Sequence, residues 1–533
     1  MQQIAVRQAH DTVRGTRRAV AASIASMLFV AIVSATPRSP FFAILPPNYE
    51  PSGPLRWLAD LIGLSNLTDG ALMVVGLLAT AASAVAFLLV VREAWAGRLP
   101  MRTVAILAVV YHVVVLMLPL LFSRDVYSYA YYGRIVSTYG GNPYVRTPDD
   151  FPLNSLWPLT WPGWRGTPSV YGPLFTWLSA ALTSVAKSIP GMINGFQVVA
   201  AAASLATLAI VARLVGRVRP ARAVFAVAVI GLNPIVVFHV VGGGHNDMIV
   251  AMFVAAAVTA LFARRTLLSA LLLGLGMSVK ASAIVPLILL IVAVVADTPR
   301  ERRTRVLLTY GGVVAGVWFA LALPFLTTQN PSLGLVEAGG HDSWMAPGQV
   351  VVRLFSGTAG LIAGDPLRVP AQTIARLCLF AVSAAGVILI GRRIWRDPAA
   401  RRPAALVAAW GWGLLVLILP SPVLFTWYLM WILPIAWVLP RVGRRSLVIL
   451  SAILVASHLV TEAALLPAAF DDVNLPFGHP LAILVALWVA REFIRMLRTA
   501  TPFDEDLPGP RFGDRFEAGG LRGDRLVVVP PSD

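Results

Sequence analysis

A carboxylate follows directly on a long apolar run in residues 121–144. The run ends at Phe122, and Arg124 and Asp125 come next, ahead of a tyrosine-rich segment and a Gly-Gly-Asn-Pro turn. A carboxylate at the hydrocarbon edge of a membrane is costly unless it has a partner or a function. Arg124 could be that partner. The alternative is that Asp125 is a catalytic base, which takes a proton from a hydroxyl group at the membrane surface.

A second polar cluster ends another apolar run at residues 242–247, which read Gly-Gly-Gly-His-Asn-Asp. Three successive glycines let the backbone turn sharply and approach a ligand closely. His245 and Asn246 are then able to hydrogen-bond sugar hydroxyls, and Asp247 is able to assist a base. The structural alternative is a tight turn between helices, with His245 and Asp247 capping the helix that follows.

One lysine, Lys280, lies near the middle of the apolar residues 267–296. Its ammonium group requires a cavity, a partner or the membrane interface. Together with the guanidinium groups of Arg124 and Arg353, it is a candidate for holding a phosphate. Such cations also stabilise the negative charge that develops on a phosphate leaving group.

Aromatic residues are frequent in the polar segments between the apolar runs. Tyr129 belongs to residues 126–139, whose helical spacing predicts an amphipathic helix lying in the membrane interface. Tyr171 precedes a Gly-Pro pair that begins a second predicted helix over residues 173–186. Tyrosine rings stack on the faces of sugars, which makes both tyrosines candidate substrate-binding residues.

The composition indicates an all-α polytopic membrane protein. Hydrophobic residues make up 57% of the 533 residues and charged residues only 13%, with a mean hydropathy of +0.75. Soluble domains carry about 25% charged residues. Cys378 is the single cysteine, which excludes a disulfide within the chain, a zinc–cysteine cluster and dithiol redox chemistry. The net charge of +17 does not indicate nucleic-acid binding, because the arginines are grouped in short loops between apolar runs.

The apolar runs predict about fourteen membrane spans, since a run of about 20 residues crosses the hydrocarbon layer. A cytoplasmic tail (1–18) precedes a transmembrane domain (19–497) with outer loops at 123–190 and 327–370, and a disordered cytoplasmic tail (498–533) follows it. The expected spans are 19–35, 71–91, 103–122, 193–212, 223–241, 248–262, two short helices meeting at Lys280 within 267–296, 306–326, 371–390, 404–419, 425–439, 446–466 and 481–496.

Charge placement predicts the orientation of these spans. The arginine-rich loops fall on the cytoplasmic side when both termini are cytoplasmic, as the positive-inside rule requires. Asp125, the His-Asn-Asp triplet and Lys280 then share one extracytoplasmic face of the plasma membrane. His341 and Asp342 lie on the same face, with the alternative that they are ordinary loop residues.

A lipid-linked phosphosugar suits this set of residues. A carboxylate would activate an acceptor hydroxyl, cations would hold the lipid phosphate, and an interfacial groove would admit the lipid tail. The sequence contains no Walker motif and no glycine-rich phosphate loop after a strand. A lipid-phosphate donor is therefore favoured over a nucleotide sugar or ATP.

Three motifs in order carry a resemblance to a known family. They are SRDVYSYAYYGRIVSTYGGNPY from residue 123, YGPLF from residue 171 and LNPIVVFHVVGGGHNDMIVA from residue 232. Together they resemble the polyprenol-phosphate-mannose-dependent α-1,6-mannosyltransferases, members of the GT-C superfamily that build the mannan of envelope lipoglycans. The resemblance covers roughly residues 103–286 with specific motifs. The C-terminal half has no motif that matches closely.

The resemblance implies a GT-C fold and transfer of mannose, with inversion, from a β-linked polyprenyl phosphate to a glycan or glycolipid acceptor. Asp125 would be the general base, and His245, Asn246 and Asp247 would line the active-site cavity. No cofactor is implied, and a divalent metal is neither required nor excluded. The residues before the YGPL motif, 167–170, lie in an unusually tryptophan-rich loop that bears on the choice of acceptor.

Two alternatives stay open at this point. One is transfer of another sugar, arabinofuranose or glucose, from the same type of lipid carrier. The other is a lipid-sugar flippase or transporter, in which paired broken helices are expected at matching positions of two repeats. Only one candidate broken segment, around Lys280, is visible in the sequence.

Overall fold

The computed structural model describes residues 2–43, 45–46, 50–330, 333, 346–455, 487 and 491. Within these residues the fold is all-helical, as expected, and strand-like pairing is limited to an isolated antiparallel bridge between Phe42 and Leu121. The α-helices are α1 (Gln2–Ser34), α2 (Pro54–Leu61), α3 (Asp69–Trp95), α4 (Met101–Leu116), α5 (Asp125–Ser137), α6 (Pro162–Arg165), α7 (Pro173–Val185), α8 (Ile189–Val218), α9 (Pro220–Gly231), α10 (Asp247–Phe262), α11 (Thr266–Met277), α12 (Ile284–Ala296), α13 (Arg303–Ala322), α15 (Pro347–Ala363), α16 (Arg368–Arg396), α17 (Pro403–Ile418) and α18 (Arg441–Leu454).

Short helical segments of other types connect the α-helices. One is a π-helix, η3 (Ile235–Val241). The others are 3-10 helices, namely η1 (Leu64–Asn66), η2 (Pro148–Asp150), η4 (Ala281–Ala283), η5 (Arg300–Arg302), η6 (Leu323–Phe325), η7 (Asp365–Leu367), η8 (Pro398–Arg401), η9 (Thr426–Trp431) and η10 (Leu433–Val438).

Five described helices are long and apolar enough to cross a membrane: Val13–Ser34 within α1, α3, α8, Arg300–Phe325 and Asp365–Arg396. The bent pair α9 and η3 would make a sixth, and further apolar helices of 10–17 residues accompany them. These helices support a membrane protein but do not establish the expected fourteen spans. The expected span at 481–496, apart from Leu487 and Arg491, and the expected tail at 498–533 lie outside the described residues.

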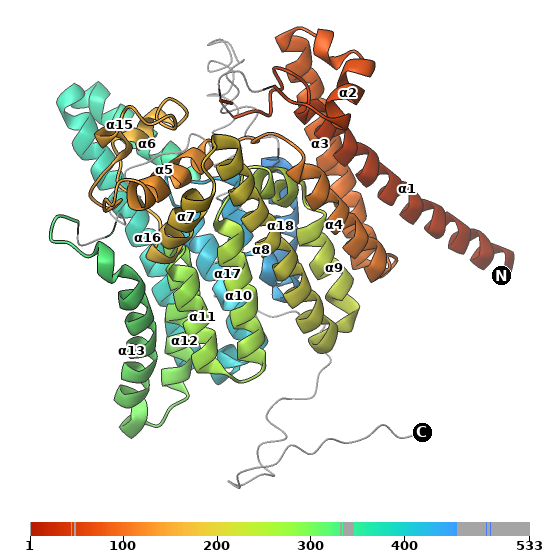
Figure 1. Ribbon diagram of the computed structural model, residues 1–533. Helices are drawn as coiled ribbons and strands as arrows, with labels where there is room; N and C mark the ends of the chain where they lie inside the picture. The colour runs from red at the N-terminus through yellow and green to blue at the C-terminus, as the bar shows by residue number, and fades with distance from the viewer. Residues whose placement is uncertain are drawn as a thin grey trace.

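The bundle has two chemically different ends. In Figure 1, α5 and α6 lie at the upper end of a bundle in which α8, α10, α11 and α12 run side by side, and the connection from α12 to α13 lies at the lower end. Arginines join the connections at that lower end. Arg401 of η8 pairs with Asp297, which follows α12, at 2.5 Å, and Arg222 of α9 donates to the Trp95 carbonyl that ends α3.

Two expected single spans are broken. The segment predicted as a span at 223–241 bends by 42° between α9 and η3. Pro234 lies at the break, where it cannot donate a backbone hydrogen bond, and the next amide, that of Ile235, donates to the side-chain oxygen of Asn233 at 3.0 Å. The segment predicted at 425–439 forms the two 3-10 helices η9 and η10, with Pro434 at the start of η10.

A strained turn places the start of α5. Phe122 adopts a left-handed backbone conformation with φ of 61°, which is uncommon for a bulky residue. Its amide donates to the carbonyl of Phe41 at 2.8 Å, and its ring stacks on His239 with centroids 4.1 Å apart. The surrounding contacts hold this conformation, and α5 begins three residues later at Asp125.

Candidate active site

A cavity of about 280 Å³ opens at the α5 end of the bundle. Two charged side chains line it, Asp125 from the first position of α5 and Lys280 from the break between α11 and η4. Aromatic and apolar side chains complete the wall. The aromatic ones are Trp164, Tyr171, Phe425, Trp427, Tyr428 and Trp431.

Asp125 is partly accessible from this cavity, with 18% of its side chain exposed. Its backbone amide donates to Ser123 Oγ at 3.1 Å, which fixes the start of the helix. One carboxylate oxygen lies 3.6 Å from Nδ1 of His245. That separation is longer than a hydrogen bond, so the imidazole and the carboxylate are close neighbours that do not hydrogen-bond to each other. A partly accessible carboxylate with a neighbouring histidine suits a general base.

His245 is fully buried and held on several sides. Its ring stacks on Trp427 with centroids 3.8 Å apart and an interplanar angle of 22°. Its Nδ1 also lies 3.3 Å from the Tyr129 hydroxyl. The preceding Gly244 has φ of 63°, and a Cβ there would lie 2.7 Å from Val126. The glycine therefore allows the His-Asn-Asp segment to pack directly against the first turn of α5.

Asp247 and Lys280 form a buried ion pair behind the cavity wall. The Lys280 ammonium lies 2.8 Å from Oδ1 and 3.0 Å from Oδ2 of Asp247, whose side chain is fully buried. The indole of Trp431 donates to the same Oδ1 at 2.8 Å. The ammonium also lies 4.7 Å from the ring centroid of Tyr428, which adds a cation–π contact. The two carboxylate oxygens of Asp247 and the ring of Tyr428 thus hold the Lys280 ammonium at the cavity surface.

A close backbone contact joins the Tyr171 segment to the Lys280 segment. Gly172 donates from its amide to the carbonyl of Val279 at 3.0 Å, and Leu174 donates to that of Ser278 at 2.9 Å. A Cβ at Gly172 would overlap the Ser278 carbonyl. Pro173 then begins α7 at a position that tolerates proline. The Tyr-Gly-Pro sequence therefore brings Tyr171 and Lys280 into one cavity wall.

The tyrosines near Asp125 are neutral groups. Tyr129 and Tyr171 are buried and meet edge to face, with ring centroids 4.9 Å apart. Burial raises the pKa of both phenols well above the ordinary value, and the negative charge of Asp125 raises it further. Both hydroxyls therefore keep their protons at neutral pH and are available as hydrogen-bond donors.

Residues 38–296 match a family model described as the N-terminal domain of alpha-(1->6)-mannopyranosyltransferase. This region belongs to the α-(1→6)-mannopyranosyltransferase family. It contains Asp125, Tyr171, His245, Asp247 and Lys280, so both charged side chains that line the cavity come from the family domain. The aromatic wall of η9 comes from beyond it.

Three relatives are similar to this chain. The alpha-(1->6)-mannopyranosyltransferase A of Corynebacterium glutamicum is 28% identical over 32% of this chain and 36% of its own length. The protein of the same name from Mycobacterium tuberculosis is 25% identical over 61% of this chain and 62% of its own length. A further alpha-(1->6)-mannopyranosyltransferase of M. tuberculosis is 25% identical over 72% of this chain and 73% of its own length. The chain thus matches less than two thirds of the first two relatives. No solved structure matches it.

The structure gathers most of the site residues expected from the sequence. Asp125, Tyr171 and Lys280 line the cavity, and His245 with Tyr129 lies directly behind Asp125. Asp247 does not line the cavity, because it is buried against Lys280. Asn246 is also buried, and its side-chain amide has no hydrogen-bond partner among the described residues.

Two expected cations lie outside the cavity lining. Arg124 precedes α5 and is half-buried, and Arg353 is exposed on α15. Both were expected to hold the donor phosphate, and within the described residues only Lys280 among the three lines the cavity. His341 and Asp342 lie outside the described residues.

No sequence pattern indicated that the aromatic side chains of η9 form a wall of the cavity. Trp427 and Tyr428 stand where a membrane span was expected to end, and tryptophans are common anchors there. Buried Trp427 instead stacks on His245, half-buried Tyr428 contacts Lys280, and buried Trp431 donates to Asp247. The available signal was Pro434, which breaks the segment and turns it inward.

Proposed function

We propose that the protein is a membrane mannosyltransferase. It transfers mannose from polyprenyl-phosphate-mannose to a hydroxyl of an envelope mannan or lipoglycan, forming an α-1,6 linkage with inversion. The observation that carries this proposal is the cavity that Asp125 and Lys280 line together at one end of an apolar bundle. Membership of residues 38–296 in the family supports the sugar and the linkage.

Asp125 acts as the general base in this reaction. Its carboxylate takes the proton of the acceptor hydroxyl while that oxygen attacks the anomeric carbon. The bond from that carbon to the phosphate oxygen breaks, and its electron pair leaves with the polyprenyl phosphate. Attack opposite to the leaving group converts a β-linked donor into an α-linked product. His245 and Tyr129 are positioning residues, which orient the carboxylate.

Lys280 receives the phosphate of the donor, and Asp247 acts through it. The ammonium has three donor hydrogens, so it can reach a phosphate oxygen while it still contacts Asp247. Cationic hydrogen bonds to phosphate strengthen as the leaving group gains charge. Tyr428 and Trp427 offer ring faces in the same cavity on which a sugar can stack. We expect transfer without a metal ion, because the lysine supplies the positive charge.

The cavity opens on the extracytoplasmic face of the cell membrane in this proposal, and both termini are cytoplasmic. The support is the separation of charges along the bundle. Arginine-rich connections lie at the end opposite to α5, and positive-inside placement makes that end cytoplasmic.

A comparison of four donors distinguishes this function from transfer of another sugar and from use of a nucleotide-sugar donor. Purified full-length protein in detergent is given a short α-1,6-mannoside with polyprenyl-phosphate-mannose, with polyprenyl-phosphate-linked arabinofuranose or glucose, or with GDP-mannose. Extension with the first donor alone, and an α anomeric signal in the product by NMR, is the expected result. Extension only with another lipid phosphosugar would reassign the sugar, and extension only with GDP-mannose would overturn the lipid-donor mechanism.

A further inference from the structure

A second cavity, the distal cavity, lies where α5 and α7 end. Its volume is about 360 Å³. Every described side chain that lines it carries a nitrogen or a hydroxyl group, among them Arg134, Thr138, Tyr139, Asn154, Ser155 and Lys187. An acyl chain would meet no apolar side chain among these residues, so a lipid tail does not fit the distal cavity.

The helices α5 and α7 run in parallel between the two cavities. Near their starts, Asp125 and Tyr171 line the cavity of the candidate active site. At their ends, the hydroxyls of Ser137 and Thr183 lie 2.9 Å apart and join the helices by a hydrogen bond. Arg134 lies nine residues beyond Asp125, which is about 14 Å along an α-helix. The distal cavity is therefore within reach of a chain molecule that also occupies the active site.

One guanidinium holds the wall of the distal cavity together. Arg134 of α5 donates from Nη1 to Oδ1 of Asn154 at 2.9 Å and to Oγ of Ser155 at 3.3 Å. Its Nη2 donates to the backbone carbonyl of Lys187, just after α7, at 3.1 Å. Three separate segments thus meet at Arg134, so the cavity is preformed and a ligand does not have to order it.

An aromatic ring forms one side of the distal cavity. Tyr139 stacks on Phe151 with ring centroids 4.1 Å apart and an interplanar angle of 8°. Its hydroxyl accepts a hydrogen bond from the side-chain nitrogen of buried Asn154 at 3.0 Å. Tyr139 nevertheless stays 41% exposed. The ring is thus fixed in position and still has free surface on which a sugar can stack.

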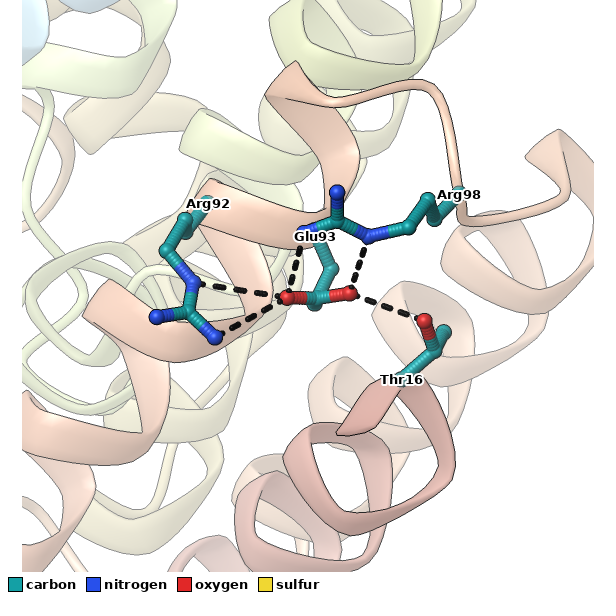
Figure 2. A network of polar contacts seen from close by, with 4 residues as sticks. All are labelled: Thr16, Arg92, Glu93 and Arg98. Carbon is teal, nitrogen blue, oxygen red and sulfur yellow. Dashed lines mark hydrogen bonds and ion pairs between the residues drawn. The ribbon is translucent and has the colours of Figure 1, made fainter. Parts of the chain in front are cut away.

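The cations at the end of α3 are balanced by a carboxylate, unlike those of the distal cavity. Figure 2 shows that Glu93 is held by Arg98 at 2.6 and 2.8 Å, by Thr16 at 2.8 Å and by Arg92. No carboxylate lines the distal cavity among the described residues, and the Lys187 ammonium makes no ion pair with any of them. That ammonium is therefore available to a ligand.

The two helix ends at the distal cavity favour a neutral ligand over an anion. A helix C-terminus carries a partial negative charge, and the C-termini of α5 and α7 offset part of the charge of Arg134 and Lys187. A ligand with many hydroxyl groups and no net charge fits this balance. Sugar hydroxyls can accept from the cations, and they can exchange hydrogen bonds with the hydroxyls of Thr138 and Ser155, which both donate and accept.

We propose that the distal cavity binds a neutral oligosaccharide, namely the part of the mannan acceptor that does not react. This proposal rests on the proposed function, which places the reacting hydroxyl of the acceptor at Asp125. The chain behind that hydroxyl extends along α5 and α7 to the distal cavity, where one sugar stacks on Tyr139 and its hydroxyls meet Lys187 and Ser155. Acceptors long enough to reach both cavities should therefore bind more tightly than short ones.

The test compares a short with a long acceptor. Full-length protein in neutral detergent is titrated in a calorimeter, without donor, with α-1,6-linked mannobiose or mannohexaose, and the KM of each in mannose transfer is measured as well. The variant Ser155→Ala/Lys187→Gln removes a hydroxyl and an ammonium from the cavity but keeps the backbone carbonyl that accepts from Arg134. The matched control, Ser184→Ala/Arg146→Gln, removes a hydroxyl and a cation at exposed positions outside both cavities.

Wild type and control should bind mannohexaose about tenfold more tightly than mannobiose, and KM should follow the same order. In the variant this ratio should fall to about threefold or less, because the longer chain loses two of its hydrogen-bonding partners. An equal ratio in variant and control would overturn the proposal, and so would equal affinity of wild type for both mannosides. Binding of inorganic phosphate that is lost in the variant would overturn it in favour of an anion site.

The titration without donor separates this proposal from the proposed function. Tighter binding of mannohexaose with no transfer from polyprenyl-phosphate-mannose would overturn the proposed reaction and still support an oligosaccharide site. Transfer to both mannosides at equal KM and equal affinity would leave the proposed reaction standing and overturn the role of the distal cavity.

Discussion

The ammonium of Lys280 donates to both carboxylate oxygens of Asp247, at 2.8 and 3.0 Å, where the carboxylate is fully buried. Removing one partner of a buried pair leaves an uncompensated charge, at a cost of about 3–5 kcal/mol. We therefore expect Asp247→Asn or Lys280→Met alone to lower the unfolding temperature by several degrees. Donor affinity should fall in both variants, because Asp247 positions the lysine.

The double variant Asp247→Leu/Lys280→Met separates stability from function. Replacing both charges by apolar groups is often close to neutral for stability. The double variant should recover most of the unfolding temperature but none of the donor affinity. Recovery of both would mean that the pair is only structural, and the role of Lys280 at the donor phosphate would be wrong.

The stack between Trp427 and His245 gives a second prediction. Replacing Trp427 by Leu removes a ring 3.8 Å from the imidazole and opens the space beside Asp125. We expect kcat/KM to fall about tenfold, equivalent to ~1.4 kcal/mol, because His245 loses its stacking partner and holds Asp125 less firmly. Trp437→Leu is the control, since Trp437 is equally buried in η10 but does not line the cavity. An equal loss in both variants would point to packing alone.

The close approach of Gly172 to Ser278 gives a third prediction. A methyl group in Gly172→Ala would overlap the Ser278 carbonyl, so α7 must move away from the Lys280 segment. Overpacking of this kind costs about 1–3 kcal/mol, and we expect donor affinity to fall with stability. Gly312→Ala on α13 is the matched control, because nothing lies within 4 Å of its Cβ position and alanine favours a helix. Normal transfer by Gly172→Ala would contradict the link between the two segments.

Metal dependence gives a fourth prediction. Transfer should keep its rate within about twofold after treatment with EDTA, because a single ammonium can balance a leaving phosphate monoester. The control adds Mg²⁺ or Mn²⁺ back to the treated enzyme. Loss of transfer on chelation with recovery on adding either ion would show that a cation shares the role given to Lys280.

Sequence patterns predicted those parts of the site that depend on local chemistry. A lysine in a long apolar stretch correctly indicated two helices meeting there, because an ammonium group cannot be left in hydrocarbon. The Gly-Gly-Gly-His-Asn-Asp run correctly indicated a turn. The contact between Asp125 and His245 joins residues that are far apart in the chain. It depends on the strained turn at Phe122, and no local sequence pattern predicts that turn.

Other features of the structure depend on long-range packing, which the sequence does not show. Residues 425–439 are apolar enough for a span, and only the packing of η9 against α10 shows that their aromatic side chains face the site. Arg353 was predicted to hold the phosphate because of its charge; α15 leaves it exposed and outside the cavity lining, and its role stays a prediction.

The most direct test of the proposed mechanism is the rate of mannoside extension by Asp125→Asn with polyprenyl-phosphate-mannose. Asparagine keeps the size of the side chain but cannot accept the proton, so kcat should fall by about 10²–10⁴ while the unfolding temperature stays close to that of wild type. Asp365→Asn, at an exposed position on η7, should retain full activity. Near wild-type extension by Asp125→Asn would contradict the assignment of Asp125 as the base.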